Sequence, residues 1–311
     1  MTTAILIVIM QALFALTFPL GKLALAYTGT LFLVGLRMTL AGLLLLSYYY
    51  FFCEKKSVTR ADWFLLIKMA IFAVYLAFVP EFWALKTMSS LKTNMLWSSL
   101  PFISALLSYY LLGERLTRNK WIGLSIGLVG MLPVVFTASP QELLRGEFMH
   151  ITLPDLMMFI AVASCAYGWF LMKQLLQKGY AIVFINGVSM LLGGLLCFAT
   201  KAVELSQATN HGPLFSEFWP VLGYTLILIL ISNVVGYSLY GYLLRTCSLT
   251  FLSFTGFLCP LFGALFSKLL VHEQLHYQYA ITFACVLFGL WLFYRDELAV
   301  HPHRNLFVCK K

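Results

Sequence analysis

Two stretches of equal length decide how this chain folds: Thr87–Leu116, TMSSLKTNMLWSSLPFISALLSYYLLGERL, and Thr246–Leu275, TCSLTFLSFTGFLCPLFGALFSKLLVHEQL. The second begins 159 residues after the first. Without any gap, identical residues coincide at Thr87/Thr246, Ser89/Ser248, Pro101/Pro260, Ala105/Ala264, Ser108/Ser267, Glu114/Glu273 and Leu116/Leu275. The match continues at Gly130 and Gly289, and nearer the start of the chain Lys22 meets Lys173 at the shorter offset of 151. Self-similarity at a fixed offset indicates an internal duplication.

The composition restricts where such a duplicated chain can fold. Of its 311 residues 61% are hydrophobic and 11% are charged, whereas soluble domains carry roughly 25% charged residues. This excludes an ordinary soluble enzyme, a nucleic-acid-binding module and a disordered chain. We interpret the net charge of +9 as a determinant of orientation in a lipid bilayer, because the basic residues lie mostly in short segments between apolar runs.

Apolar runs of membrane-spanning length follow one another along the whole chain. A bilayer core needs about 20 apolar residues per helix. Ten runs meet this criterion: Ala4–Leu25, Thr30–Phe52, Trp63–Lys86, Met88–Leu111, Asn119–Thr137, Leu153–Met172, Ala181–Lys201, Phe218–Leu244, Leu249–Val271 and Gln278–Tyr294. The sequence therefore predicts an all-α integral membrane protein with ten transmembrane helices.

The duplication divides these ten helices into two halves. The boundaries place a first repeat at residues 1–138, a linker at 139–152, a second repeat at 153–294 and a basic tail at 295–311. Because each half has an odd number of helices, the second starts on the opposite side of the membrane. The two halves are therefore expected to be inverted repeats, an arrangement typical of secondary transporters that bind substrate near the midplane.

The distribution of basic residues predicts the orientation. If the amino terminus is cytoplasmic, 14 of the 21 Lys and Arg residues fall on the inner side. Arg37 lies within a span, and the six on the outer side are Lys22, Lys86, Lys92, Arg145, Lys201 and Lys268. An excess of Lys and Arg marks the cytoplasmic side. We expect a multi-pass protein of the cell inner (plasma) membrane with both termini in the cytoplasm.

The chain resembles the drug/metabolite transporter superfamily, specifically its ten-helix EamA-type carriers. The resemblance rests on three runs: Ser99–Phe102, Leu112–Leu116 with its Gly-Glu pair, and the glycine-rich Gly123–Gly130. The second half departs from the pattern at one place, because His272 stands where the family usually has glycine. The resemblance covers nearly the whole chain.

The resemblance implies a secondary-active, alternating-access carrier of small polar metabolites rather than an enzyme. A narrower group that the chain is similar to is the S-adenosylmethionine/S-adenosylhomocysteine transporters of intracellular bacteria, and an amino-acid or other metabolite carrier is the alternative. The expected partners are a small-molecule substrate and the bilayer, with no nucleic acid, and the protein is expected to be a monomer or a homodimer.

Arg37 is the first candidate for substrate binding. It lies inside the second apolar run, where a charge costs at least ~2.5 kcal/mol by insertion scales. It could bind a substrate carboxylate or phosphate through its guanidinium. A structural pair with Glu81, or extension of the side chain to the interface, would explain it equally.

Glu81 is the second candidate, and it follows Pro80 in the third run. Proline removes a backbone donor and leaves a carbonyl free. A carboxylate beside such a break, among aromatic residues, suits an ammonium or sulfonium cation or a proton. A salt bridge to Arg37 or Lys86 is the alternative.

Aromatic and amide residues form a third group. Asn233, Tyr237 and Tyr240 share one helical face, which could hydrogen-bond and stack on a nucleobase or attract an organic cation. Interhelical hydrogen bonds or an interfacial belt would explain the same residues. Further candidates of this kind are Asn94, Trp97, Tyr167, Trp169 and Asn186.

Structural or gating roles are expected elsewhere. Pro101 and Pro260 should break their helices near mid-depth. Glu114 and Glu273, repeated at helix ends, should pair with basic neighbours. Gly123 and Gly127 match Gly-x-Ser-x-Gly within an apolar run, where close helix packing explains them.

Metal and cofactor sites have little support. His272–His276 matches His-Glu-x-x-His, the basis of a zinc protease as an alternative of another class. However, Glu273 is already explained by the repeat, and no third ligand is evident. The cysteines form no CxxC pair and are expected to be free thiols. A channel is disfavoured because no filter sequence or ring of repeated charge is present. We expect no cofactor and no metal.

Overall fold

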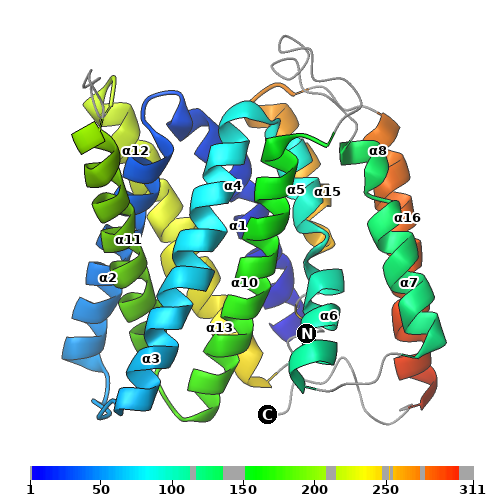
Figure 1. Ribbon diagram of the computed structural model, residues 1–311, viewed down its shortest axis with the longest axis horizontal. Coiled ribbons are helices and arrows are strands. Elements are labelled where there is room, and N and C mark those ends of the chain that lie inside the picture. Colours follow the sequence, from blue (N-terminus) through cyan, green and yellow to red (C-terminus); the bar gives the residue numbers. More distant parts are fainter. Residues whose placement is uncertain are drawn as a thin grey trace.

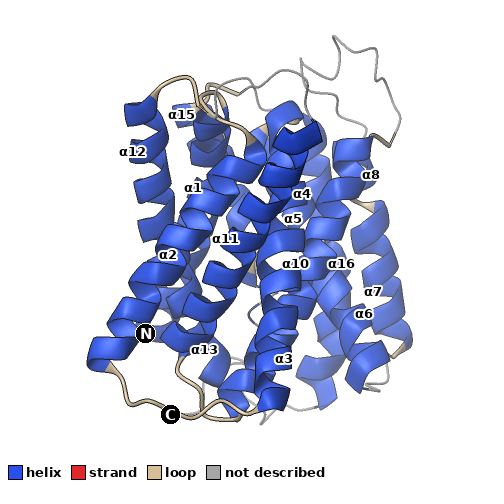
Figure 2. Ribbon diagram, turned by 60° about the vertical axis from the view of Figure 1, so that its left-hand side comes forward, coloured by secondary structure: helices blue, strands red, loops and turns tan. Residues whose placement is uncertain are grey.

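The computed structural model describes residues 2–112, 117–135, 151–207, 215–246, 252, 255–273 and 277–300. Within these residues every regular element is a helix, as Figure 2 shows, apart from one isolated bridge between Thr28 and Phe215. The all-α prediction is confirmed. Six of the described helices are long and apolar enough to cross a membrane: Thr3–Leu25, Thr30–Phe52, Arg60–Thr87, Leu153–Gln177, Ile182–Ser206 and Phe218–Arg245.

The elements of the first half occur in the order α1 (Thr2–Leu25), α2 (Thr30–Phe52), α3 (Arg60–Met69), η1 (Ala70–Tyr75), α4 (Leu76–Thr87), α5 (Ser90–Trp97), α6 (Leu100–Leu112), α7 (Arg118–Val129) and α8 (Leu132–Val135). The second half contains α10 (Leu153–Gln177), α11 (Ile182–Gln207), α12 (Phe218–Leu228), η2 (Ile229–Gly236), α13 (Tyr237–Thr246), α15 (Leu258–Leu270) and α16 (Tyr277–Val300). The four remaining expected spans correspond to other helices. Two of them are interrupted, as α5–α6 and α7–α8, and the other two correspond to α15 and α16.

The starts of several helices follow from capping residues in the sequence. Thr59 and Ser89 accept hydrogen bonds from the backbone N–H groups of the first turns of α3 and α5. Thr152 and Asp155 form a capping box at the start of α10. Each satisfies backbone donors that have no partner inside the helix.

The helix break that the sequence predicts near Pro101 is present. Two residues, Ser98 and Ser99, separate α5 from α6, and Pro101 enters the first turn of α6. Proline is tolerated there because its missing N–H group would have no intrahelical acceptor. Pro260 occupies the first turn of α15 in the same way.

Two π-helical turns interrupt long helices at corresponding places. The turn η1 begins at Ala70 and η2 begins at Ile229, which is 159 residues later, the same offset that relates Pro101 to Pro260. Pro80 lies just after η1, but its counterpart after η2 is Leu239, so these wide turns do not depend on proline. Such turns are rare in proteins, and those that occur are often found at functional sites.

Helices from the two halves pack against each other in matching pairs. The most extensive contact is between α2 and α11, at the left of Figure 1, and α7 packs on α16 at the right. In the centre, α1 contacts the α12–η2–α13 helix and α15, while α10 contacts the α3–η1–α4 helix and α6. Figure 1 also shows that α1 and α10 cross the bundle in opposite directions.

The α2–α11 contact is reciprocal in detail. A β-carbon at Gly42 would lie 2.5 Å from the backbone nitrogen of Leu191, and one at Gly194 would lie 2.6 Å from the backbone nitrogen of Thr39. An offset of 152 relates Gly42 to Gly194 and Thr39 to Leu191. Gly42 therefore contacts the counterpart of Thr39, and Thr39 contacts the counterpart of Gly42.

Candidate functional site

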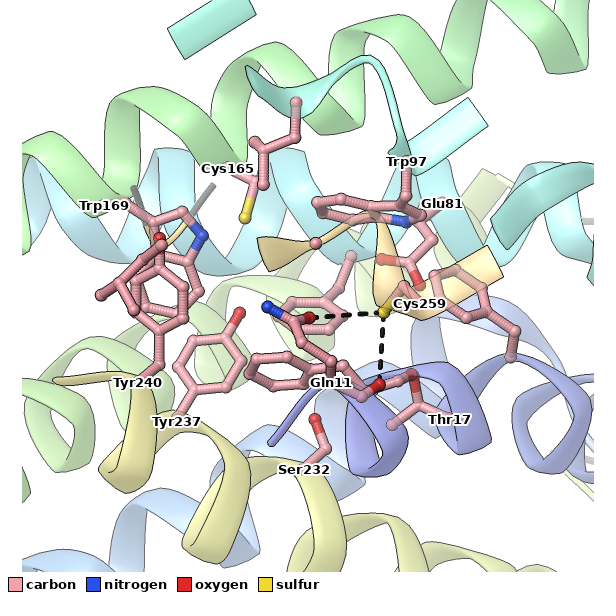
Figure 3. Close-up of a pocket in the computed structure, with 16 residues that line it drawn as sticks. Gln11, Thr17, Glu81, Trp97, Cys165, Trp169, Ser232, Tyr237, Tyr240 and Cys259 are labelled. Atoms are coloured by element: carbon pink, nitrogen blue, oxygen red, sulfur yellow. Dashed lines mark hydrogen bonds between the residues drawn. The ribbon is translucent and has the colours of Figure 1, made fainter. Parts of the chain in front are cut away.

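A cavity lies in the middle of the bundle between α1, α4, α5, α10, α13 and α15, and Figure 3 shows its side chains. About 650 Å³ of space here, counting the part that is open to solvent, is not filled by protein atoms. The polar side chains and cysteines that line it are Gln11, Thr17, Glu81, Cys165, Ser232 and Cys259. Its aromatic side chains are Phe14, Phe18, Phe78, Trp97, Trp169, Tyr237 and Tyr240, and Leu100, Leu252 and Gly256 complete the lining.

One end of the cavity is an aromatic cluster from the second half, formed by Trp169, Tyr237 and Tyr240. The rings of Trp169 and Tyr240 are stacked, with centroids 3.9 Å apart and planes at 27°. Tyr237 packs on the same indole at 4.8 Å. Because Tyr237 and Tyr240 are nearly one helical turn apart on α13, both reach the side chain of Trp169 on α10. This end of the cavity is therefore aromatic, a lining suited to an aromatic ring or to an organic cation.

The opposite end holds Glu81, which lies beside Trp97 in Figure 3. Glu81 is 3% exposed, and its Oε2 atom has no hydrogen-bond partner among the described residues. A buried carboxylate is costly unless it is paired. Glu81 therefore presents an unsatisfied acceptor to the cavity, and a cation or a hydrogen-bond donor bound there would satisfy it.

Arg37 lies behind the wall of the cavity and does not line it. Its guanidinium is fully buried, donates from Nε to Asn233 Oδ1 at 2.6 Å and from Nη2 to Ser232 Oγ at 2.8 Å. It also lies over the rings of Phe78 and Phe82, at 5.0 and 5.5 Å. Arg37 thus joins α2 to η2.

The pairing of Arg37 with Glu81 that the sequence left open does not occur as a direct contact. Among the described residues no ion pair within 4.0 Å joins the two side chains, and Lys86 is exposed. Glu81 on α4 lines the cavity, whereas Arg37 on α2 does not. The ring of Phe78, which Arg37 lies over, is part of the lining.

Five of the ten substrate-binding candidates line the cavity: Glu81, Trp97, Trp169, Tyr237 and Tyr240. The remaining five do not. Asn233 accepts a hydrogen bond from Arg37. Asn94 packs against Gly263, so closely that a β-carbon added at Gly263 would lie 2.3 Å from Asn94 Nδ2. Tyr167 packs edge-on against Phe72. Asn186 is fully buried, and its amide has no hydrogen-bond partner among the described residues.

Sequence reasoning missed several lining residues, and the duplication contains the signal that would have found them. Most of the lining consists of residues related by an offset of 151 or 159: Phe14/Cys165, Phe18/Trp169, Phe78/Tyr237, Glu81/Tyr240, Trp97/Gly256 and Leu100/Cys259. A cavity at the interface of two related halves is lined by corresponding positions from both. Gln11 had a separate signal, because it is a lone amide in a long apolar run.

Glu273 is bound in a structural contact. Its carboxylate accepts hydrogen bonds from the backbone N–H groups of Ser90 at 2.7 Å and Leu91 at 3.0 Å. It therefore caps α5, the helix of the other half, instead of pairing with a basic side chain. Its counterpart Glu114 lies outside the described residues.

Two further sequence motifs are placed by the structure. The glycine pair Gly123 and Gly127 faces Gly289, whose β-carbon would lie 2.6 Å from the carbonyl oxygen of Gly123, so these glycines permit close packing of α7 on α16. In His-Glu-x-x-His, His272 is exposed and Glu273 caps α5, while His276 lies outside the described residues. Within the described part of the chain, no group of three or more metal-ligating side chains occurs.

Comparison with known proteins gives consistent results. The profile of the EamA-like transporter family matches residues 1–136 and 152–295. The chain is 30% identical to the S-adenosylmethionine/S-adenosylhomocysteine transporter of Chlamydia muridarum, over 94% of this chain and 92% of that protein. It is 29% identical to the transporter of the same name from Chlamydia trachomatis serovar L2, over 94% and 90%. A crystal structure of a protein with 16% identity has the same fold, with a TM-score of 0.63 over 95% of this chain and 97% of the other.

Proposed function

The chain belongs to the EamA-like transporter family, and from this premise we propose that it carries S-adenosylmethionine across the membrane in exchange for S-adenosylhomocysteine. The names of the two Chlamydia relatives support this substrate pair. An amino-acid carrier of the same family is the alternative that the experiment below separates.

The observation that carries the proposal is the chemistry of the central cavity. It joins an unpaired carboxylate, Glu81, to the aromatic cluster of Trp169, Tyr237 and Tyr240, and no basic side chain occurs among the described residues that line it. S-adenosylmethionine has a sulfonium cation and an aromatic base. Glu81 and the face of Trp97 would hold the cation, and the aromatic cluster would stack on the base.

Arg37 and Asn233 have a positioning role in this proposal. The hydrogen bonds from Arg37 to Ser232 and Asn233 hold η2 against α2. Ser232 lines the cavity, and Tyr237 and Tyr240 follow on the next turns of the same helix. Arg37 would therefore act on the substrate through the position of these phenols.

Transport would proceed by alternating access between two inverted halves. The opposite directions of α1 and α10 (Figure 1) and the reciprocal contacts of α2 with α11 support the inversion. Ion pairs link the halves at both ends of the bundle. Lys92 pairs with Asp155 at 3.1 Å at one end, and Asp62 pairs with Lys178 at the other. Opening one end would require that its ion pair separates.

We place the Asp62–Lys178 end, the end at which α1 begins and α16 ends in Figure 1, in the cytoplasm. The basic residues Lys55, Lys56 and Arg60 near this end support that orientation. In a bacterial cell the membrane would be the inner membrane.

Counterflow in proteoliposomes tests the substrate. Vesicles containing purified protein and unlabelled S-adenosylhomocysteine should accumulate external labelled S-adenosylmethionine faster than empty vesicles, and uptake should saturate. Vesicles loaded with mixed amino acids are the matched control. Stimulation by amino acids with none by S-adenosylhomocysteine would establish the alternative, and unsaturable flux would indicate a channel.

A further inference from the structure

The side chain of Gln11 lies between the two ends of the cavity. It comes from α1, is 3% exposed, and Figure 3 shows its amide between Glu81 and the aromatic cluster. An amide inside a membrane-spanning helix is costly unless it is bonded, and such residues mark substrate paths. Neither the sequence candidates nor the proposed function assigns it a role.

The orientation of this amide is fixed by its contact with Thr255, which lies just before α15, and Cys259 in the first turn of α15 lies next to it. The Thr255 hydroxyl donates its proton to the Leu252 carbonyl at 2.7 Å, so it can only accept from Gln11. Gln11 Nε2 donates to it at 2.8 Å. The Cys259 thiol has a single proton and two acceptors on Gln11, the backbone carbonyl oxygen at 3.3 Å and Oε1 at 3.5 Å. The nitrogen and the oxygen of the amide are therefore distinguished by hydrogen bonding.

These contacts use at most half of the hydrogen-bonding capacity of the amide. A glutamine side chain has two N–H donors and an oxygen with two lone pairs. Thr255 takes one donor, and the thiol of Cys259, which it shares with the backbone carbonyl of Gln11, takes at most one lone pair. One N–H group and at least one lone pair remain on this residue, which lines the cavity.

We propose that Gln11 determines specificity for adenine by accepting a hydrogen bond from the 6-amino group and donating one to N7. This assignment rests on the proposed function, because it requires an adenosyl substrate in the cavity. A glutamine amide matches this edge of adenine through two parallel hydrogen bonds. The base would stack on the aromatic cluster. Stacking does not distinguish one base from another, because every base has a π-face, so Gln11 would supply the discrimination.

Hypoxanthine and 7-deazaadenine test the two bonds separately on the unchanged protein. Hypoxanthine replaces the 6-amino donor by an oxygen acceptor, and 7-deazaadenine lacks the N7 acceptor. We expect purified protein in nanodiscs to bind S-inosylhomocysteine roughly 5- to 100-fold more weakly than S-adenosylhomocysteine, the span expected when an amide that matches adenine meets the wrong base. The 7-deaza analogue should bind roughly 2- to 10-fold more weakly, because it loses one neutral bond.

The variant Gln11→Leu should remove the preference. It should bind the adenosyl and inosyl compounds with an affinity ratio near one, whereas a purely structural Gln11 would leave the ratio unchanged. Asn186→Leu is the matched control, because it removes a buried amide that does not line the cavity, and it should keep the ratio of the parent protein.

The possible failures are distinguishable. Equal binding of the adenosyl and inosyl compounds by the parent protein, or a preference that persists in Gln11→Leu, would overturn the role of Gln11 and leave the proposed substrate intact. Absence of binding of both S-adenosylmethionine and S-adenosylhomocysteine would overturn the substrate and this assignment together. If Gln11→Leu does not fold, the analogue series on the parent protein decides alone.

Discussion

Glu81 and Tyr240 occupy corresponding positions in the two halves of the chain, 159 residues apart, and both line the central cavity. Duplication has therefore placed an acid on one side of the site and a phenol on the other. The two ends of the cavity differ in charge although their backbones are related. A substrate that is cationic at one end and aromatic at the other matches this asymmetry.

The first prediction concerns the charge of Glu81. Glu81→Gln keeps the size and removes the charge, so binding of S-adenosylmethionine should weaken roughly 10- to 100-fold, as expected for loss of a charge-assisted contact. S-adenosylhomocysteine has a neutral sulfur and should lose less. Competition binding with both ligands checks this, with Tyr240→Phe as the control that keeps the charge. Equal losses for both ligands would show that Glu81 does not contact the sulfonium.

The second prediction concerns the hydrogen bond between Arg37 and Asn233, which is 2.6 Å long. Arg37→Met should lower the free energy of unfolding by about 2 kcal/mol, because it leaves buried acceptors without a donor. Asn233→Leu should also destabilise. The double variant should cost less than the two single costs together, with a coupling energy of about 1–3 kcal/mol. Denaturant unfolding in mixed micelles measures the cycle, and additive costs would show that the bond is not a stabilising unit.

Some features of the site could be predicted from the sequence because they depend on spacing along the chain. The offset of 159 relates the two π-helical turns as well as the two prolines. The spacing of Tyr237 and Tyr240 placed both on one face, and they do share the cavity with Trp169. Glu81 was recognisable because an isolated carboxylate in an apolar run must face the protein interior.

Other features depend on which face of a helix meets which neighbour, and a membrane helix conceals this. Lipid-facing and buried positions are both apolar, so periodicity does not separate them. For this reason the sequence did not show that Tyr167 packs against Phe72 outside the cavity. It also did not show that Arg37 lies behind the wall of the cavity, where it binds Ser232. Gln11 reaches the site only because α1 lies beside the chain before α15, a contact between residues more than 240 positions apart.

The third prediction concerns the turn after α15. His272 has a φ of 55°, in the left-handed region that favours glycine. An L residue costs about 1–2 kcal/mol there, and part of the gain on replacing it is lost to the greater freedom of glycine in the unfolded chain. His272→Gly should therefore raise the free energy of unfolding by about 0.5–1 kcal/mol. His272→Ala keeps the β-carbon and should give no such gain, and a gain in both variants would point to the imidazole as the cause.

The fourth prediction concerns the contact between α2 and α11. A β-carbon at Gly42 or at Gly194 would lie within 2.6 Å of a backbone nitrogen of the other helix, so neither helix can yield by moving a side chain alone. Gly42→Ala and Gly194→Ala should each lower the free energy of unfolding by about 1–3 kcal/mol, the usual cost of overpacking. Gly223→Ala is the matched control. It lies in α12 with nothing within 4 Å of the added carbon, and it should be neutral or stabilising, because alanine favours a helix. Because the two glycines hold corresponding places in a reciprocal contact, their costs should be similar. A cost at one position only would mean that the two halves do not meet across a two-fold axis.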